Sequence, residues 1–232
     1  VSMKMPHTST LLLYPATRAG FPAGRPATTQ TALSVAALAV FLESQDAYTR
    51  EHGRRVAAYA ERMSRQLGLS TSDVEAVRLG GLLHDIGKIA FSPNLMTNTQ
   101  TRLSAGMRAE IRRHPEIGRA ILETLHVAAP VVDCVHYHHE RLDGSGYPCG
   151  LAADRIPLGA QIISVADCFD ALTTDRPYQK GKSSAEALSI LEKLAGTGLN
   201  AELVRTFCRD LRLNGKTASA ETHLHPGRIG LH

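Results

Sequence analysis

The sequence lacks tryptophan and has few aromatic residues of any kind, which make up 5% of its 232 residues. Apolar residues nevertheless account for 43% and charged residues for 21%, the ordinary balance of a globular protein. A chain of this length can form one domain with a sizeable core. We therefore expect a core built mainly from Leu, Ile, Val, Ala and Met side chains.

Cysteine is also scarce, and the four cysteines show no CxxC spacing: Cys134, Cys149, Cys168 and Cys208. This pattern argues against a disulfide framework and predicts a reducing, cytoplasmic setting. No long apolar run is present, because the longest stretch, residues 32–42, is only about half of the roughly 20 residues that a membrane span needs. We expect it to form a buried helix, and the residues before it lack the layout of a secretory signal.

The net charge of +4 is small, and it comes from the two ends of the chain. Residues 1–30 carry three basic residues and no acidic one, whereas the middle of the chain is close to neutral. A near-neutral body argues against a nucleic-acid polymer as a partner. Both ends are also rich in Thr, Ser, Pro, Ala or Gly without periodicity, which predicts a disordered lead or linker over 1–30 and a disordered tail over 214–232.

Between these ends, over 31–213, apolar residues recur with the 3.6-residue period of an α-helix. Ser70 and its neighbours provide N-caps, and Pro115 and Pro130 suit first helical turns. The sequence predicts an all-α domain of about seven to nine helices. Helices are expected over residues 52–67, 74–86, 104–113, from 115, from 130, over 158–169, 184–195 and 201–211.

Two adjacent pairs of ligand-type residues carry the chemistry, His84-Asp85 and His138-His139. Three further residues, His52, His114 and Asp167, lie in or beside core-facing stripes. Burying so many ionisable groups without partners would cost several kcal/mol for each charged group, by order of magnitude. A single histidine of this kind is usually only a core or surface residue, but a cluster of divalent metal ions accounts for the whole set.

Four segments resemble the HD-GYP family of cyclic di-GMP phosphodiesterases, a branch of the HD phosphohydrolases. They are HDIGK at 84–88, HPEIG at 114–118, HHERLDGSGYP at 138–148 and VADCFDALTTDRPY at 165–178. Together they extend the resemblance over about residues 40–210 in the family's order. The resemblance implies an all-α fold, a metal centre and hydrolysis of cyclic di-GMP to pGpG, with a further cut to GMP left open.

The resemblance also implies residue roles. His52, His84, Asp85 and Asp167 would hold one metal ion, and His114, His138 and His139 a second, with Asp85 bridging. Asp85 and Lys88 would be the catalytic residues, iron or manganese the metal. The substrate contacts implied are Lys88, Arg141, Asp143, Gly144, Gly146, Tyr147, Pro148 and Arg176.

Two positions depart from the family's pattern. Members with a third metal tend to carry Glu one helical turn before the first His, where this chain has Tyr48. Tyrosine is a poor ligand at neutral pH because its pKa is about 10, so we predict two metal ions. Glu51 does not substitute, because neighbouring helix positions point in different directions. In the segment after HDIGK, Thr99 stands near the position where the family has Lys, which removes a cation close to the substrate phosphates.

Two alternatives remain at this stage. The site could hydrolyse another nucleotide or cyclic dinucleotide, since no base-reading pattern is evident. The domain could instead be a catalytically weak module that binds a cyclic dinucleotide or docks a partner such as a diguanylate cyclase (GGDEF) protein. Control would then come from metal supply, from a partner, or from oligomerisation such as a homodimer.

Overall fold

The computed structural model describes residues 37–38, 47–96, 103–175 and 180–221, and every regular element in these ranges is helical. The all-α prediction is therefore confirmed. The elements are α2 (Ala47–Gln66), α3 (Thr71–Leu83), η1 (Ile86–Ala90), α4 (Pro93–Met96), α5 (Ala105–Ile111), α6 (His114–Thr124), α7 (Ala129–Tyr137), η2 (Ala153–Arg155), α8 (Leu158–Thr173), α9 (Ser184–Leu194) and α10 (Ala201–Glu221).

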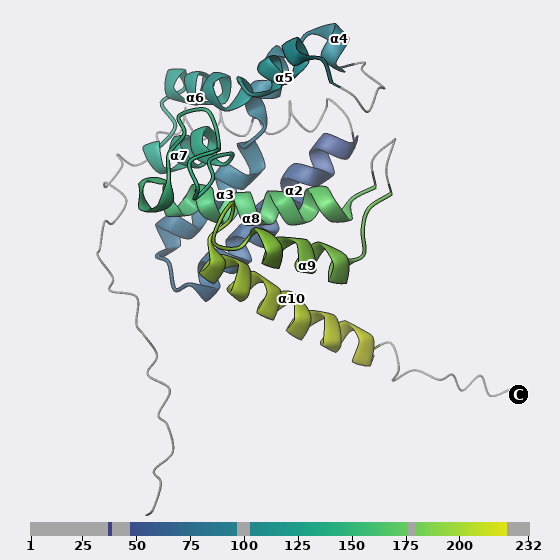
Figure 1. The fold of residues 1–232 in the computed structure, drawn as a ribbon. Helices are drawn as coiled ribbons and strands as arrows, with labels where there is room; N and C mark the ends of the chain where they lie inside the picture. Colours follow the sequence, from purple (N-terminus) through teal and green to yellow (C-terminus); the bar gives the residue numbers. More distant parts are fainter. Residues whose placement is uncertain (1–36, 39–46, 97–102, 176–179, 222–232) are drawn as a thin grey trace, which may run out of the picture.

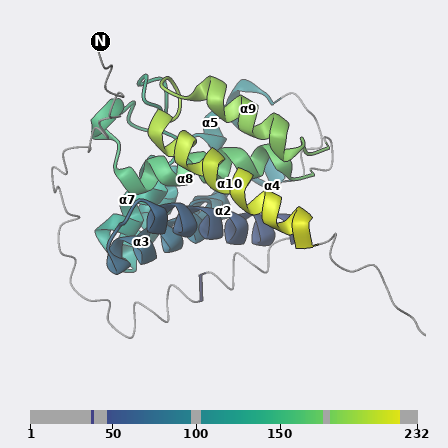
Figure 2. The ribbon, with the colours of Figure 1, turned by 90° about the horizontal axis from the view of Figure 1, so that it is seen from below.

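Helices α2, α3 and α8 form the centre of the bundle, and each packs against the other two. In Figure 1, α9 and α10 lie below α8, whereas α4 to α7 lie above it. The view from below shows α10 crossing in front of α8 and α2 (Figure 2), and α10 contacts both of them. The pair His84-Asp85 follows α3, and the pair His138-His139 follows α7. Because α7 packs against α3 and α8, both pairs lie where the upper helices meet the central layer.

An aromatic cluster joins α2, α8 and α10. The rings of Tyr59, Phe169 and Phe207 meet edge to face, with centroids 5.1 to 5.7 Å apart. Such pairs are favoured because the positive edge of one ring faces the negative face of another. Aliphatic side chains of Val, Ile, Leu, Ala and Met fill the rest of the two buried clusters, as the composition predicts.

Several predicted helix boundaries were wrong. The helix expected over 74–86 begins at Thr71, capped by Ser70, and ends at Leu83, so that His84 and Asp85 occupy a turn before the 3₁₀ segment η1. Shortly beyond this turn the chain packs closely on α6, where a side chain at Gly87 would overlap the backbone carbonyl of His114. At the other end, α10 continues past 213 to Glu221, into the segment for which the sequence predicted a disordered tail. No described helix has both the length and the apolar character needed to cross a bilayer.

Candidate metal centre

The seven predicted metal ligands come from five places in the bundle and converge. His52 lies in α2, His84 and Asp85 follow the end of α3, and His114 begins α6. His138 and His139 follow α7, and Asp167 lies in α8. Within the described residues, His52, His84 and Asp85 form one group with ligand atoms within 4.8 Å of one another, and His114, His138 and His139 form a second.

In the first group, imidazole and carboxylate atoms face one another across short gaps. The Nε2 atom of His84 lies 3.3 Å from Oδ2 of Asp85, and Nε2 of His52 lies 3.8 Å from the same oxygen. Asp167 adds a second carboxylate, with its Oδ1 3.2 Å from Nε2 of His52 and 3.9 Å from Nε2 of His84. Two imidazoles and two carboxylates thus surround one small volume.

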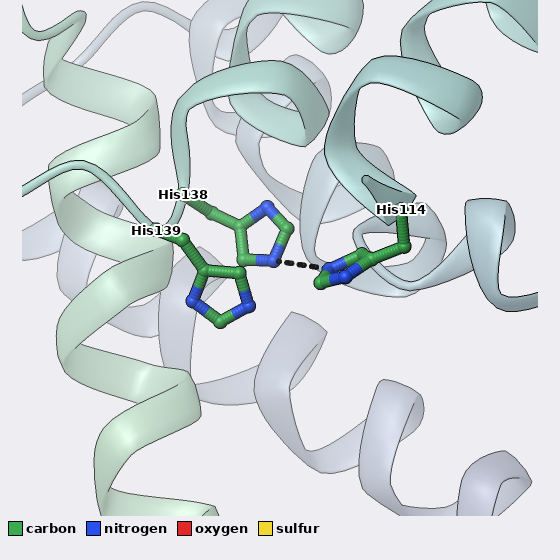
Figure 3. Close-up of side chains that lie close together, drawn as sticks. All are labelled: His114, His138 and His139. Atoms are coloured by element: carbon green, nitrogen blue, oxygen red, sulfur yellow. Dashed lines mark hydrogen bonds between the residues drawn. The ribbon is translucent and has the colours of Figure 1, made fainter. Parts of the chain in front are cut away.

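In the second group, three imidazoles point toward one another, as Figure 3 shows. The Nε2 atoms of His114 and His138 are 3.3 Å apart, and the ring of His139 lies 4.1 Å from that of His138 between centroids. Asp85 connects the two groups, because its other oxygen, Oδ1, lies 3.4 Å from Nε2 of His114. Its carboxylate therefore occupies the position of a bridge.

Backbone hydrogen bonds fix the tautomers of three of these rings. The Nδ1 atoms of His84, His114 and His138 lie 2.7 to 2.8 Å from the carbonyl oxygens of Gly81, Ile111 and Val135. A carbonyl oxygen only accepts, so each Nδ1 carries a proton, and a ring that is neutral presents a lone pair at Nε2. The lone pairs of His114 and His138 then face each other at 3.3 Å, an arrangement that repels unless a cation lies between them.

The pKa directions agree with a set of neutral imidazoles. Burial lowers the pKa of His138 well below its ordinary value, the pKa of His139 to about 4 and that of His114 below its ordinary value. Burial would raise the pKa of Asp85, but the side chains of His84, Lys88 and His114 hold it well below its usual range. Neutral imidazole and ionised carboxylate are the forms that bind a metal ion.

His52 behaves differently in the metal-free protein. Burial would lower its pKa, but hydrogen bonds to Asp167 and Asp170 outweigh that effect and raise the pKa to about 9. A proton at Nε2 of His52 is therefore what a metal ion would replace. The donor set of imidazoles and carboxylates suits first-row transition metals, and the residues present fit such a group.

The comparisons with known proteins agree with the geometry of the two ligand groups. The model of the HD domain family matches residues 37–214. The chain belongs to the HD domain family. This confirms the resemblance drawn from the sequence motifs, and family membership together with the two ligand groups makes the domain a metal-dependent one.

Two relatives of this HD domain show how similar the chain is to characterised proteins. It is 39% identical over 193 residues to a cyclic di-GMP phosphodiesterase of Pseudomonas aeruginosa, covering 83% of this chain and 46% of that protein. It is 34% identical over 179 residues to the 3′3′-cGAMP-specific phosphodiesterase 3 of Vibrio cholerae, covering 77% of this chain and 39% of that protein. The chain thus spans less than half the length of either relative.

A solved structure supports the fold of the HD domain. An HDG"Y"P protein of Bdellovibrio bacteriovorus superposes with a TM-score of 0.60 at 21% identity, over 78% of this chain and 63% of that one. At this identity the likeness concerns the helical arrangement alone.

Around the first group, the HD domain holds two supporting residues that the sequence reasoning did not assign. The carboxylate of Asp170, 1% exposed, lies 2.8 Å from Nδ1 of His52. Arg55 donates to both oxygens of Asp170, at 2.6 and 3.0 Å. One signal was visible, because Asp170 follows Asp167 by three residues and Arg55 follows His52 by three, so each lies on the same helix face as a ligand.

Most of the residues predicted to contact the substrate are Lys88 or members of the loop after His139. Nζ of Lys88 donates to Oδ2 of Asp85 at 2.5 Å and remains 41% exposed as a side chain. The Tyr147 ring stacks on that of His139 at 4.7 Å, which places it at the edge of the second group. Burial raises the pKa of the Tyr147 phenol, so it stays protonated at neutral pH.

The other residues of this loop serve its own structure. Arg141 donates to Ser145 at 2.9 Å and to Asp143 at 3.4 Å, so these side chains bond within the loop and are not aimed at the metal ligands. Buried Glu140, which the sequence reasoning left without a role, accepts from the backbone amides of Cys149 and Leu151 at 2.7 and 3.0 Å. Gly144 has a φ of 75° and Pro148 follows a cis peptide bond.

Three positions named from the sequence lie outside the described residues. They are Arg176, Thr99 and the side chain of Tyr48. Glu51, next to the first ligand, has a side chain that is 53% exposed and lies 3.9 Å from Arg54.

Proposed function

We propose that this HD domain is a metal-dependent phosphodiesterase that hydrolyses cyclic di-GMP to pGpG. The observation that carries the proposal is the pair of ligand groups joined by Asp85, in which the lone pairs of His114 and His138 face each other at 3.3 Å. The names of the relatives, cyclic di-GMP and cGAMP phosphodiesterases, supply the class of substrate.

We propose two divalent cations at this centre, iron or manganese. His52, His84, Asp85 and Asp167 would hold the first, and His114, His138 and His139 the second, with Asp85 between them. Such a pair, when bound, supplies Lewis acidity at the phosphoryl oxygens and a water of lowered pKa. A third ion is not proposed, because Tyr48 stands one helical turn before His52.

The side chains of the chain itself have three tasks in this reaction. Asp85 stays ionised beside Lys88 and keeps the two ligand groups at a fixed separation. Lys88, half exposed, places a positive charge where negative charge develops on the phosphoryl oxygens. Asp170 and Arg55 hold the His52 ring in one orientation, which is the usual role of residues behind a ligand.

The loop over Gly144, Gly146, Tyr147 and Pro148 is proposed to border the substrate, because Tyr147 stacks on His139. Arg141 and Asp143 would act by shaping this loop. Arg176 stays a proposed substrate contact on the strength of its motif. The domain is proposed to extend over 31–213, with α10 continuing beyond it to Glu221, and the absence of CxxC spacing supports a reducing, cytoplasmic setting.

The test is incubation of manganese- or iron-loaded protein with cyclic di-GMP, followed by chromatography of the products. The matched control is the variant His84→Ala/Asp85→Ala. Appearance of pGpG with the wild type and its loss in the variant are expected. A protein with two measured metal equivalents that forms no product would contradict the proposal and favour a module that binds the nucleotide or docks a GGDEF partner.

A second substrate has support of its own, because one relative is named for 3′3′-cGAMP. The same assay with 3′3′-cGAMP in competition with cyclic di-GMP separates the two. We expect a higher kcat/KM for cyclic di-GMP, and the reverse order would reassign the substrate while leaving the reaction class in place.

A further inference from the structure

A three-layer stack extends from the metal ligands toward solvent. The ring of Tyr147 lies on that of His139 with an interplanar angle of 28°, and the guanidinium carbon of Arg112 lies 4.5 Å from the centre of the Tyr147 ring. We call this the Arg112–Tyr147–His139 stack. It joins α5, which ends just before Arg112, to the loop that follows α7.

The backbone of Arg112 is held in place at the edge of the site. Arg112 is the C-cap of α5, its amide donates to the carbonyl of Arg108 at 3.0 Å, and His114 follows two residues later. The Tyr147 ring then selects one direction for the side chain, because a guanidinium is attracted to an aromatic face. The helix end therefore fixes the backbone of Arg112 and the Tyr147 ring fixes its guanidinium, so the positive charge has a defined position relative to the metal ligands.

The charge of Arg112 is not neutralised by a carboxylate within the described ranges. Arg55 and Arg119, by contrast, donate to Asp170 and Glu123 at 2.6 and 2.8 Å. Arg112 is exposed, and its stacked partner is neutral. A guanidinium has its N–H donors in one plane, where they can form paired hydrogen bonds to a phosphate while an aromatic ring holds the group in place.

We propose that Arg112 binds the phosphodiester of the cyclic dinucleotide that is not cut. This inference rests on the proposed function. A cyclic dinucleotide carries two phosphodiesters in one ring, so one lies to the side when the other is at the metal ligands. Lys88, bonded to Asp85, is the cation beside the centre, whereas a whole aromatic ring separates Arg112 from His139. Arg112 would thereby supply a phosphate-binding cation in a chain that has Thr99 near the family's Lys position.

The experiment compares two substrates, cyclic di-GMP and bis(p-nitrophenyl) phosphate, which has a single phosphodiester. Arg112→Met should raise KM for cyclic di-GMP about ten-fold or more, because a charged hydrogen-bond pair is lost. Hydrolysis of bis(p-nitrophenyl) phosphate should change less than two-fold, with metal content unaltered. Tyr147→Leu should also raise KM for cyclic di-GMP, and the double variant should be little worse than Arg112→Met alone.

Arg113→Met is the matched control. Arg113 is the exposed neighbour of Arg112, its loss changes the net charge equally, and no described aromatic ring lies beneath it. It should leave both substrates unaffected. Equal KM values for wild type and Arg112→Met with cyclic di-GMP, or equal losses on both substrates, would overturn this inference alone. A wild type that cleaves bis(p-nitrophenyl) phosphate but neither cleaves nor binds cyclic di-GMP would overturn the proposed substrate as well.

Discussion

The carboxylate of Asp170 lies 2.8 Å from Nδ1 of His52 and accepts two hydrogen bonds from the Arg55 guanidinium. His52 can therefore present only Nε2 toward Asp85 and Asp167. The orientation of one proposed ligand on α2 thus depends on a residue of α8 that lies three positions beyond Asp167.

Asp170→Asn should weaken binding at the first metal position about 10- to 100-fold, because an amide no longer fixes the His52 ring or raises its basicity. Calorimetric titration of the metal-free protein with manganese measures this change in metal affinity. Asp210→Asn is the control, since Asp210 is also buried and paired with an arginine, Arg62 at 2.5 Å, but between α2 and α10. Loss of metal affinity equal in both variants would indicate general destabilisation and no specific role for Asp170.

The metal-free protein should lose stability when the pH falls from 7 to 5. The pKa values of His114, His138 and His139 are lowered in the folded state, that of His139 to about 4, whereas the unfolded chain titrates near 6.5. Below pH 6.5 the unfolded state therefore binds more protons, and His139 alone accounts for about 2 kcal/mol between pH 7 and 5.

His52 acts in the opposite direction. Its pKa is raised to about 9, so its contribution is complete below pH 6.5 and is lost as the pH rises through 9. Urea unfolding at pH 5, 7 and 9 should thus show the greatest stability near neutral pH, and bound metal should increase stability most at pH 7 and above. A metal-free protein that is equally stable at pH 5 and 7 would contradict the assignment of neutral, buried imidazoles.

The helices and the ligand set could be predicted from the sequence because both leave local signals. Helical periodicity placed α8 despite the β-branched run over 162–165, and the adjacent pairs His84-Asp85 and His138-His139 indicated the metal centre. The end of α3 could not be predicted this way, because Gly87, the helix-stopping residue in the sequence, lies four positions beyond Leu83, the last residue of the helix.

The roles of Asp170 and Glu140 were also beyond local reasoning. Asp170 shares a helix face with Asp167, but it meets His52 across 118 positions of sequence, so the contact itself depends on the packing of α8 on α2. Glu140 accepts from the backbone amides of residues 149 and 151, and any residue except proline would provide these amides. The side chains at 149 and 151 therefore cannot indicate this contact.

Glu140→Gln should loosen the loop that carries Tyr147. The amide keeps one acceptor oxygen but turns an NH₂ group toward one of the two backbone donors at Cys149 and Leu151. We expect a loss of about 1.5–3 kcal/mol in the free energy of unfolding, the range for hydrogen bonds to a charged group. Amide exchange at Cys149 and Leu151 should accelerate while metal binding is retained.

Glu123→Gln serves as the control for the loss of one carboxylate. Glu123 pairs with Arg119 on the surface of α6, where its side chain is 51% exposed, and such pairs contribute less than about 1 kcal/mol. Unchanged exchange at Cys149 and Leu151 in Glu140→Gln would show that the loop is held by other contacts.

Gly146→Ala should be destabilising by about 1–3 kcal/mol, the usual cost of overpacking. A Cβ atom there would lie 2.5 Å from the amide nitrogen of Arg141 and 2.6 Å from the carbonyl oxygen of His139. Since the backbone of Gly146 is not in the left-handed region, the clash alone causes the loss, and displacement of His139 should also weaken metal binding.

Gly106→Ala in α5 is the matched substitution, because its Cβ would meet nothing nearer than Ser104 Oγ at 3.9 Å. That change should stabilise the helix by about 0.5–1 kcal/mol. Thermal unfolding and metal titration of both variants measure the difference, and a Gly146→Ala protein with wild-type metal affinity would mean that the loop can shift without moving His139.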